Sequence, residues 1–234
     1  MNGWPRRIGR GIWLLAIALA LCPASGWGAQ QAHYTVLIDP AHGGDDTGVV
    51  SDKIREKDLT LNLALMIRQE AQKTANFQVQ MTRSADRGAS VADRIKTAAG
   101  MKPDCLISLH VNAGFGKKAA GYEVYFPGFN APPAGADGPA PIVKDMEQNR
   151  SLNDSVRLAH RIQDALESVF PRKGRGLRDA PCPLLEGTAV PGIVVEVGFA
   201  THPEDRKALG TEEKQRAVAR AMVRGLREYF QKSP

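Results

Sequence analysis

The sequence predicts an α/β fold, a single three-layer domain in which a mostly parallel sheet of about six strands carries helices on both faces. Two observations predict it. Short apolar runs rich in Val, Ile, Tyr and Phe recur along the chain, and segments of helical length separate them. Strands that alternate with helices are typical of layered domains with a parallel sheet. No internal repeat or second domain is visible.

The predicted strands are short apolar segments bounded by turn residues. The first, YTVLID, stops before Pro40, which cannot donate a hydrogen bond to a neighbouring strand, and the glycines that follow can turn at no steric cost. The predicted strands cover residues 34–39, 77–82, 104–110, 121–126 and 192–198, with a weaker candidate at 183–186.

Three segments between and after these strands predict helices. Residues 56–71 also alternate with period two, but their length and their content of Ala, Leu, Met, Arg, Gln and Glu favour a helix. Residues 153–170 place apolar side chains on one face of a predicted helix, with Asn153 as its N-terminal cap and Pro171 as the residue that ends it. Residues 211–230 place apolar side chains opposite Lys and Arg, as an amphipathic helix does.

One segment departs from this alternation. Residues 127–152 are rich in Pro, Gly and Ala and are longer than the plain connections of compact domains. We interpret the segment as an insertion that forms either a surface loop or a lid. The stretch IVKDMEQN within it could form a short helix.

The N-terminal 29 residues predict a secretory signal peptide whose cleavage point is approximate. Arg6, Arg7 and Arg10 precede the run GIWLLAIALALC, which is apolar but too short to span a bilayer comfortably. Small residues from position 24 onward offer cleavage points. We therefore expect residues 30–234 to form one exported domain in the periplasm or cell envelope, without a stable membrane span after cleavage.

The charge and the cysteines argue against a nucleic-acid-binding protein and against a small scaffold held by disulfides. Removing the three N-terminal arginines lowers the formal net charge from +6 to +3, which favours anionic surfaces only mildly. No basic block or aromatic and basic interleaving indicates nucleic acid as a partner. Cys105 and Cys182 could pair in an oxidising compartment, but a buried free thiol suits the apolar strand around Cys105 equally well.

Polar side chains stand near the carboxyl ends of the predicted strands. His42 follows the first strand, His110 ends the third, and Glu196 lies toward the end of the last. Glu56 opens the helix after the His42 loop. A parallel sheet brings these side chains to one edge, which is where open α/β sheets bind ligands.

Two imidazoles and one carboxylate are a complete set of protein ligands for a catalytic zinc ion. Zinc lowers the pKa of bound water to about 7 and polarises a carbonyl, so a base is still needed near the water. Glu196 could supply that base, because a carboxylate in the run IVVEV is costly to bury unless it is paired or used.

The residues around His42 could support such a site. Asp39 could orient an imidazole from behind, and Gly43 and Gly44 would let the backbone approach metal and substrate. The spacing alone does not establish a metal site, because no local H-E-x-x-H motif exists. Single histidines are more often structural or solvated, and that interpretation is kept for the remaining ones, which are His33, His160 and His202.

Four strings carry a resemblance to a known family. VLIDPAHGGDDTG, REKDLTLNLA, CLISLHVNA and PGIVVEVGFATHPED resemble, in the same order, the signature blocks of the zinc-dependent N-acetylmuramoyl-L-alanine amidases, which are bacterial cell-wall hydrolases. MTRSADRGASVADRI resembles the segment that connects two of these blocks. The similarity runs from about residue 34 to residue 230, and four ordered blocks are more specific than any single one.

The resemblance implies roles for the residues gathered above. It implies that His42, Glu56 and His110 bind one zinc ion per chain and that Glu196 is the catalytic glutamate. The implied substrate is peptidoglycan, and the implied reaction is hydrolysis of the amide between N-acetylmuramic acid and the L-alanine of the stem peptide. A metal-bound water would be the nucleophile, with Glu196 as general base and acid.

The resemblance leaves several points open. Residues 127–152 fall where some division-associated relatives carry a helix that plugs the active site, so a plug and a flexible connection both stay open. No wall-targeting module is recognisable, which means that an activator or localising partner brings the protein to the wall or that the fold itself does. Ala41 stands where the family usually has glycine.

Two other functions are compatible with the same residues. A zinc hydrolase of this architecture could act on another amide, such as a peptide bond or an acetamide, because the metal and the base would be identical. A wall-binding regulator that has lost catalysis is the third alternative. Its expected mark is a missing ligand or a replaced base, and the sequence shows neither.

Overall fold

The computed structural model describes most of the predicted domain. Contacts divide the chain into two units, Met1–Gln30 and Gln31–Pro234, and all that follows concerns the second. Apart from Met1, the predicted signal peptide lies outside the described residues, and so does His33. The structure describes residues 1, 34–74, 76–116, 118–128, 139–171 and 176–231.

A six-stranded sheet forms the centre of the domain, in the order β4-β1-β5-β8-β6-β7. All neighbouring strands are parallel except β6 and β8, which run antiparallel. This arrangement confirms the predicted α/β class with its mostly parallel sheet. The strand bounds are β1 Tyr34–Pro40, β4 Phe77–Met81, β5 Cys105–Asn112, β6 Glu123–Phe126, β7 Gly176–Asp179 and β8 Gly192–Phe199.

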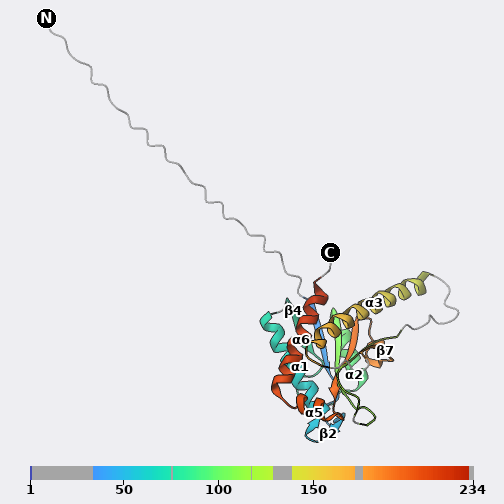
Figure 1. Ribbon diagram of the computed structural model, residues 1–234. Helices are drawn as coiled ribbons and strands as arrows, with labels where there is room; N and C mark the ends of the chain where they lie inside the picture. Colours follow the sequence, from blue (N-terminus) through green and yellow to red (C-terminus); the bar gives the residue numbers. More distant parts are fainter. Residues whose placement is uncertain (2–33, 75, 117, 129–138, 172–175, 232–234) are drawn as a thin grey trace. The chain divides into compact units, whose positions relative to one another are not determined.

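Helices cover both faces of this sheet (Figure 1). Helices α1, α3 and α6 pack together on one face, whereas α2 and α4 pack against each other on the other. A two-stranded hairpin, β2 Val50–Ser51 with β3 Ile54–Arg55, precedes α1. Among the described residues, no helix combines the length and apolarity needed to cross a membrane. The helices are α1 Glu56–Thr74, α2 Val91–Met101, α3 Pro139–Glu167, α4 Pro183–Glu186, α5 Pro203–Leu209 and α6 Glu212–Phe230.

Successive side chains of the central strands enter two different apolar clusters. Val36 and Ile107 belong to the larger cluster with α1, α3 and α6, whereas Leu37 and Leu106 belong to the smaller one with α2 and α4. Because adjacent residues of a strand point to opposite faces, burial on both sides requires the continuous apolar runs seen in the sequence.

Helix α6 is the amphipathic helix that the sequence predicts. Thr211 caps its N-terminus by accepting a hydrogen bond from the amide of Lys214. Its buried stripe includes Met222 and Leu226, and Phe230 stacks on Tyr34 at the start of β1 with ring centroids 4.3 Å apart. The last helix is therefore fixed to the first strand.

The weakest of the predicted strands is wrong. Residues 183–186 form helix α4 rather than a strand, because Pro183 is accepted in the first turn of a helix and Leu184 and Leu185 are buried there against the smaller cluster. The sixth strand is instead β7, a half-exposed edge strand with the sequence GLRD. Such a strand lacks the apolar run that would announce it.

Helix α3 begins at Pro139 rather than at Asn153, so Asn153 lies inside the helix and the predicted cap is wrong. The later part of the 127–152 insertion, including IVKDMEQN, is therefore helical. The question of a plug also concerns residues 129–138, which lie outside the described residues. Cys105 and Cys182 are free, buried and in different clusters, so they form no disulfide.

Candidate metal centre

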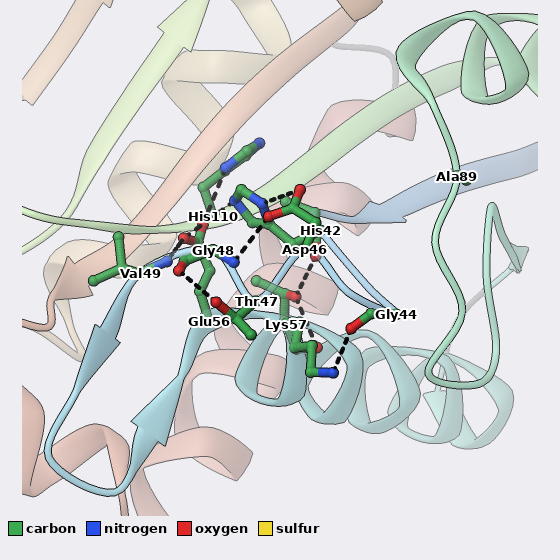
Figure 2. A network of polar contacts seen from close by, with 12 residues as sticks. His42, Gly44, Asp46, Thr47, Gly48, Val49, Glu56, Lys57, Ala89 and His110 are labelled. Carbon is green, nitrogen blue, oxygen red and sulfur yellow. Dashed lines mark hydrogen bonds and ion pairs between the residues drawn. The ribbon is translucent and has the colours of Figure 1, made fainter.

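His42 lies in the loop that follows β1, at the carboxyl end of the sheet. Its backbone adopts φ 62°, a left-handed conformation that residues with a Cβ rarely take. The side-chain Nδ1 donates to Oδ2 of Asp46 at 2.8 Å, which leaves Nε2 3.2 Å from Oε2 of Glu56. The Nε2 atom of His42 is therefore the one that faces the other candidate ligands, as Figure 2 shows.

Glu56 is the first residue of α1 and is 2 % exposed. Its two oxygens accept hydrogen bonds from separate parts of the chain. Oε2 accepts from the amide of Val49 at 2.9 Å, and Oε1 accepts from the amide of Val111 at 2.9 Å. The Glu56 carboxylate thus joins the His42 loop, the start of α1 and the end of β5.

His110 lies near the end of β5, and its Nδ1 is 3.1 Å from Oε1 of Glu56. The ligand atoms of His42, Glu56 and His110 all lie within 4.8 Å of one another. Two imidazole nitrogens and a carboxylate oxygen at this separation can hold one metal ion, and this donor set suits zinc. The structure therefore brings together the three ligands that the resemblance implies.

The charges within this cluster depend on one another. The hydrogen bond to Glu56 raises the pKa of His42 to about 9 despite its partial burial, and Asp46 adds to the effect. Burial alone would raise the pKa of Glu56, but hydrogen bonds from His110, His42 and two backbone amides bring it well below its usual range. The carboxylate is therefore held in its ionised form, which is the form that binds metal.

The carboxylate that accepts the hydrogen bond from Nδ1 of His42 belongs to Asp46 and not to Asp39. Asp39 is buried and accepts hydrogen bonds from Thr82, Arg94 and Ser108, none of which belongs to the cluster. The hydrogen bond from His42 lowers the pKa of Asp46, so this carboxylate is also ionised. Sequence reasoning missed Asp46, although its place four residues after His42 in a glycine-rich loop is a usable signal.

The glycines of the loop have different roles from those expected. A Cβ on Gly43 would lie 2.2 Å from the carbonyl oxygen of Arg87, and one on Gly44 would lie 2.7 Å from the amide of Gly88. These two glycines thus allow close packing of two backbones. It is Gly48, with φ +61°, that lies against the candidate ligands, since its Cβ would come within 2.6 Å of both Glu56 and His42.

Glu196 lies on β8 directly opposite His110 of β5 in the register of the sheet. Residues paired in this way point to the same face, so the two side chains are neighbours. The Oε2 atom of Glu196 is buried and has no hydrogen-bond partner among the described residues. Burial raises the pKa of Glu196 to about 7. A half-buried carboxyl with one buried, unpartnered oxygen beside a candidate ligand histidine is suited to proton transfer.

Two of the remaining histidines have structural or solvent-exposed positions. His202 precedes α5 and caps it, because its Nδ1 accepts a hydrogen bond from the amide of Asp205. His160 lies on α3 with its side chain exposed. Neither belongs to the cluster of metal-binding groups.

Comparisons with known proteins agree with this geometry. The profile of the family described as N-acetylmuramoyl-L-alanine amidase matches residues 36–228. The protein YqiI of Bacillus subtilis is 28 % identical over 225 residues, which cover 96 % of this chain and 98 % of that protein. The amidase AmiC of Escherichia coli is 25 % identical over 235 residues, and the match covers 89 % of this chain but 55 % of AmiC.

A solved structure shows the same fold. The crystal structure of the N-acetylmuramoyl-L-alanine amidase from Clostridium difficile 630 superposes with a TM-score of 0.71 at 29 % sequence identity. The superposition covers 86 % of this chain and 99 % of that one. The similarity therefore spans almost the whole of that chain and not a shared fragment.

Proposed function

Because the chain belongs to the N-acetylmuramoyl-L-alanine amidase family, we propose that it is a zinc-dependent hydrolase of peptidoglycan. The bond cleaved is the amide between N-acetylmuramic acid and the L-alanine of the stem peptide. The observation that carries the proposal is the meeting of His42, Glu56 and His110 within 4.8 Å, with Glu196 beside His110.

His42, Glu56 and His110 would hold one zinc ion through Nε2, a carboxylate oxygen and Nδ1. When bound, zinc lowers the pKa of water and polarises the carbonyl of the scissile amide. Asp46 fixes the orientation of the His42 ring by accepting from its Nδ1 at 2.8 Å. Such a carboxylate behind a ligand imidazole also makes the imidazole a stronger base.

Glu196 would transfer the protons of the reaction. It would accept a proton from the attacking water and then donate that proton to the nitrogen of L-alanine. The protonated nitrogen departs as a neutral amine, which is a better leaving group than the deprotonated nitrogen anion. Its raised pKa, about 7, suits both directions of transfer near neutral pH. The buried Oε2 without a partner is the atom that supports this assignment.

The two alternative functions make different predictions. A regulator without catalysis would lack a ligand or the base, but all four side chains are present, three of them within 4.8 Å of one another and Glu196 opposite His110. A peptidase or deacetylase would use the same groups on another bond. The relatives named as amidases support the muramoyl amide, and product analysis decides between the bonds.

Digestion of purified peptidoglycan tests the proposed reaction. We expect release of intact stem peptides that carry a free L-alanine amine, which mass spectrometry and amine labelling detect. A chelator should stop the release, and added zinc should restore it, since two neutral imidazoles and a carboxylate hold the ion reversibly. Cleavage within the stem peptide, or activity unaffected by removal of all metal, would contradict the proposal.

The domain organisation forms part of the proposal. We assign residues 1–29 to a signal peptide and residues 30–234 to the catalytic domain, with an insertion at 127–152. Exported amidases act in the periplasm or cell envelope, where peptidoglycan lies. The apolar run near the N-terminus and the three arginines before it support this assignment.

A charge placed in the apolar run should block export. We expect the Leu15→Arg protein to remain in the cytoplasm with its N-terminus uncut, because a charged residue opposes insertion of the run into the membrane. The native chain should be found in the envelope fraction with a new N-terminus near residues 24–30, as measured by mass spectrometry. Arg7→Lys, which keeps the charge, is the matched control. An uncut native N-terminus in the envelope fraction would count against a cleaved signal.

A further inference from the structure

Four backbone carbonyls of the His42 loop accept hydrogen bonds from cationic side chains. Arg83 donates to the carbonyls of Pro40 and Ala41, both at 2.9 Å. Arg94 donates to those of Pro40, at 2.9 Å, and His42, at 2.8 Å. We call Arg83 and Arg94 the arginine clamp, because the two guanidinium groups grip three successive carbonyls around one candidate ligand.

A third cation holds the other end of the loop. Lys57 Nζ donates to the carbonyl of Gly44 at 2.7 Å, as Figure 2 shows. It also donates to Oδ2 of Asp86 at 2.8 Å. The other oxygen of Asp86 accepts from the amide of Gly44 at 2.8 Å. The loop is thus held before, at and after His42.

The clamp is buried, which is costly for cations unless their hydrogen bonds are satisfied. Arg83 is 0 % exposed and Arg94 is 7 % exposed. Arg94 pairs with Asp39 at 2.5 Å. Arg83, in contrast, has no carboxylate within salt-bridge distance among the described residues, and its hydrogen bonds go to neutral oxygens of the loop and its surroundings.

The conformation of the His42 loop needs stabilising contacts from residues outside the loop. The left-handed backbone of His42 is unfavourable for a residue with a side chain, so the free loop would prefer other conformations. Asp46 fixes the ring of His42 but not its backbone. The clamp acts on the backbone, because Arg94 binds the carbonyl of His42 itself.

We propose that Arg83 and Arg94 are positioning residues that set the His42 imidazole in its metal-binding orientation before the ion arrives. This inference rests on the proposed zinc site. A preorganised ligand needs no rearrangement when it binds, so loss of the clamp should weaken metal binding more than it weakens the fold.

Zinc affinity of the Arg94→Lys protein tests the inference. Lysine keeps the positive charge beside Asp39 but lacks the fork that reaches two carbonyls at once. We expect the apparent Kd for zinc to rise about 10–100-fold, the range typical of partners behind metal ligands. Competition with a chromophoric chelator measures it. Turnover of the amide should recover toward the native value when zinc saturates the site.

Two control variants separate positioning from stability. Arg216→Lys changes an exposed arginine paired with Glu212 on α6, and its zinc affinity should equal the native one. Val218→Ala removes buried methyl groups from α6, so it should lower the melting temperature but not the zinc affinity. An Arg94→Lys protein that melts like Val218→Ala yet binds zinc like the native chain would overturn the inference.

A milder variant covers the case in which Arg94→Lys fails to fold. Thr60 Oγ1 donates to the carbonyl of Ala41 at 3.0 Å and accepts from Arg83 at 3.3 Å. Valine has nearly the same shape without the hydroxyl, so it removes one partner of the clamp. We expect Thr60→Val to weaken zinc binding by a smaller factor in the same direction, and native affinity would overturn the inference. A native chain that takes up no zinc would contradict the proposed function itself, and with it this inference.

Discussion

Replacement of Glu196 by glutamine should remove most turnover while the protein still binds zinc. The amide has nearly the same shape as the carboxyl but cannot accept a proton from water at neutral pH. General acid–base catalysis typically contributes about 10²- to 10⁴-fold, so we expect a loss of that order. Initial rates of stem-peptide release and metal analysis of the same preparation measure the two quantities.

A matched control lies at the start of α5. Glu204 is exposed and belongs to no part of the candidate site, so Glu204→Gln should retain native turnover and native zinc content. If Glu196→Gln turns over at a rate near the native one, then another group must act as the base. If it loses its zinc, then Glu196 contributes to metal binding rather than to proton transfer.

Replacement of His42 by alanine should remove the metal itself. The variant keeps only Glu56 and His110, and zinc sites with three protein ligands do not retain the ion firmly with two. We expect the zinc affinity to fall by more than the roughly 100-fold seen when a partner behind a ligand is lost, and turnover to fall to background. Equilibrium dialysis followed by metal analysis checks the loss.

His160→Ala is the comparison for that experiment. His160 is exposed on α3 and takes no part in the cluster, so its removal should leave both zinc content and turnover unchanged. Stoichiometric zinc in the His42→Ala protein after dialysis would refute the assignment of His42 as a ligand. His110→Ala should behave like His42→Ala, because each supplies one of the two imidazoles.

The sequence predicted the central strands and the site for the same physical reason. A strand buried on both faces must be apolar along its length, so β1, β5 and β8 stand out, and polar residues at their ends stand out more. His110 and Glu196 were found this way, and the register of β5 and β8 places them side by side. A parallel sheet alone predicts that these residues share one edge, and the pairing of β5 with β8 makes them neighbours there.

The elements that the sequence missed are those that tertiary contacts determine. The edge strand β7 is half exposed and has a polar sequence, and α4 is one turn long. Neither has a periodic pattern that could announce it. The sequence does not predict the start of α3, because a Pro- and Gly-rich composition favours loops. The helix nevertheless begins at Pro139, since proline is accepted at the first position of a helix.

The error over Asp39 has a different origin. Asp39 and Ser108 are opposite each other on β1 and β5, so the carboxylate points across the sheet to Ser108 rather than forward to His42. Nearness in sequence suggested the wrong partner. Asp39 nevertheless acts on the loop indirectly. It accepts a hydrogen bond from Arg94, and Arg94 donates another to the carbonyl of His42.

The Glu56 carboxylate already draws two imidazoles and two amides together within the polypeptide. The three pieces of chain that would share an ion are thus gathered by the fold alone. Metal binding would then exchange the protons on these ligands for a cation in a site that is already assembled. If the proposed zinc ion binds there, these three segments need not move to receive it.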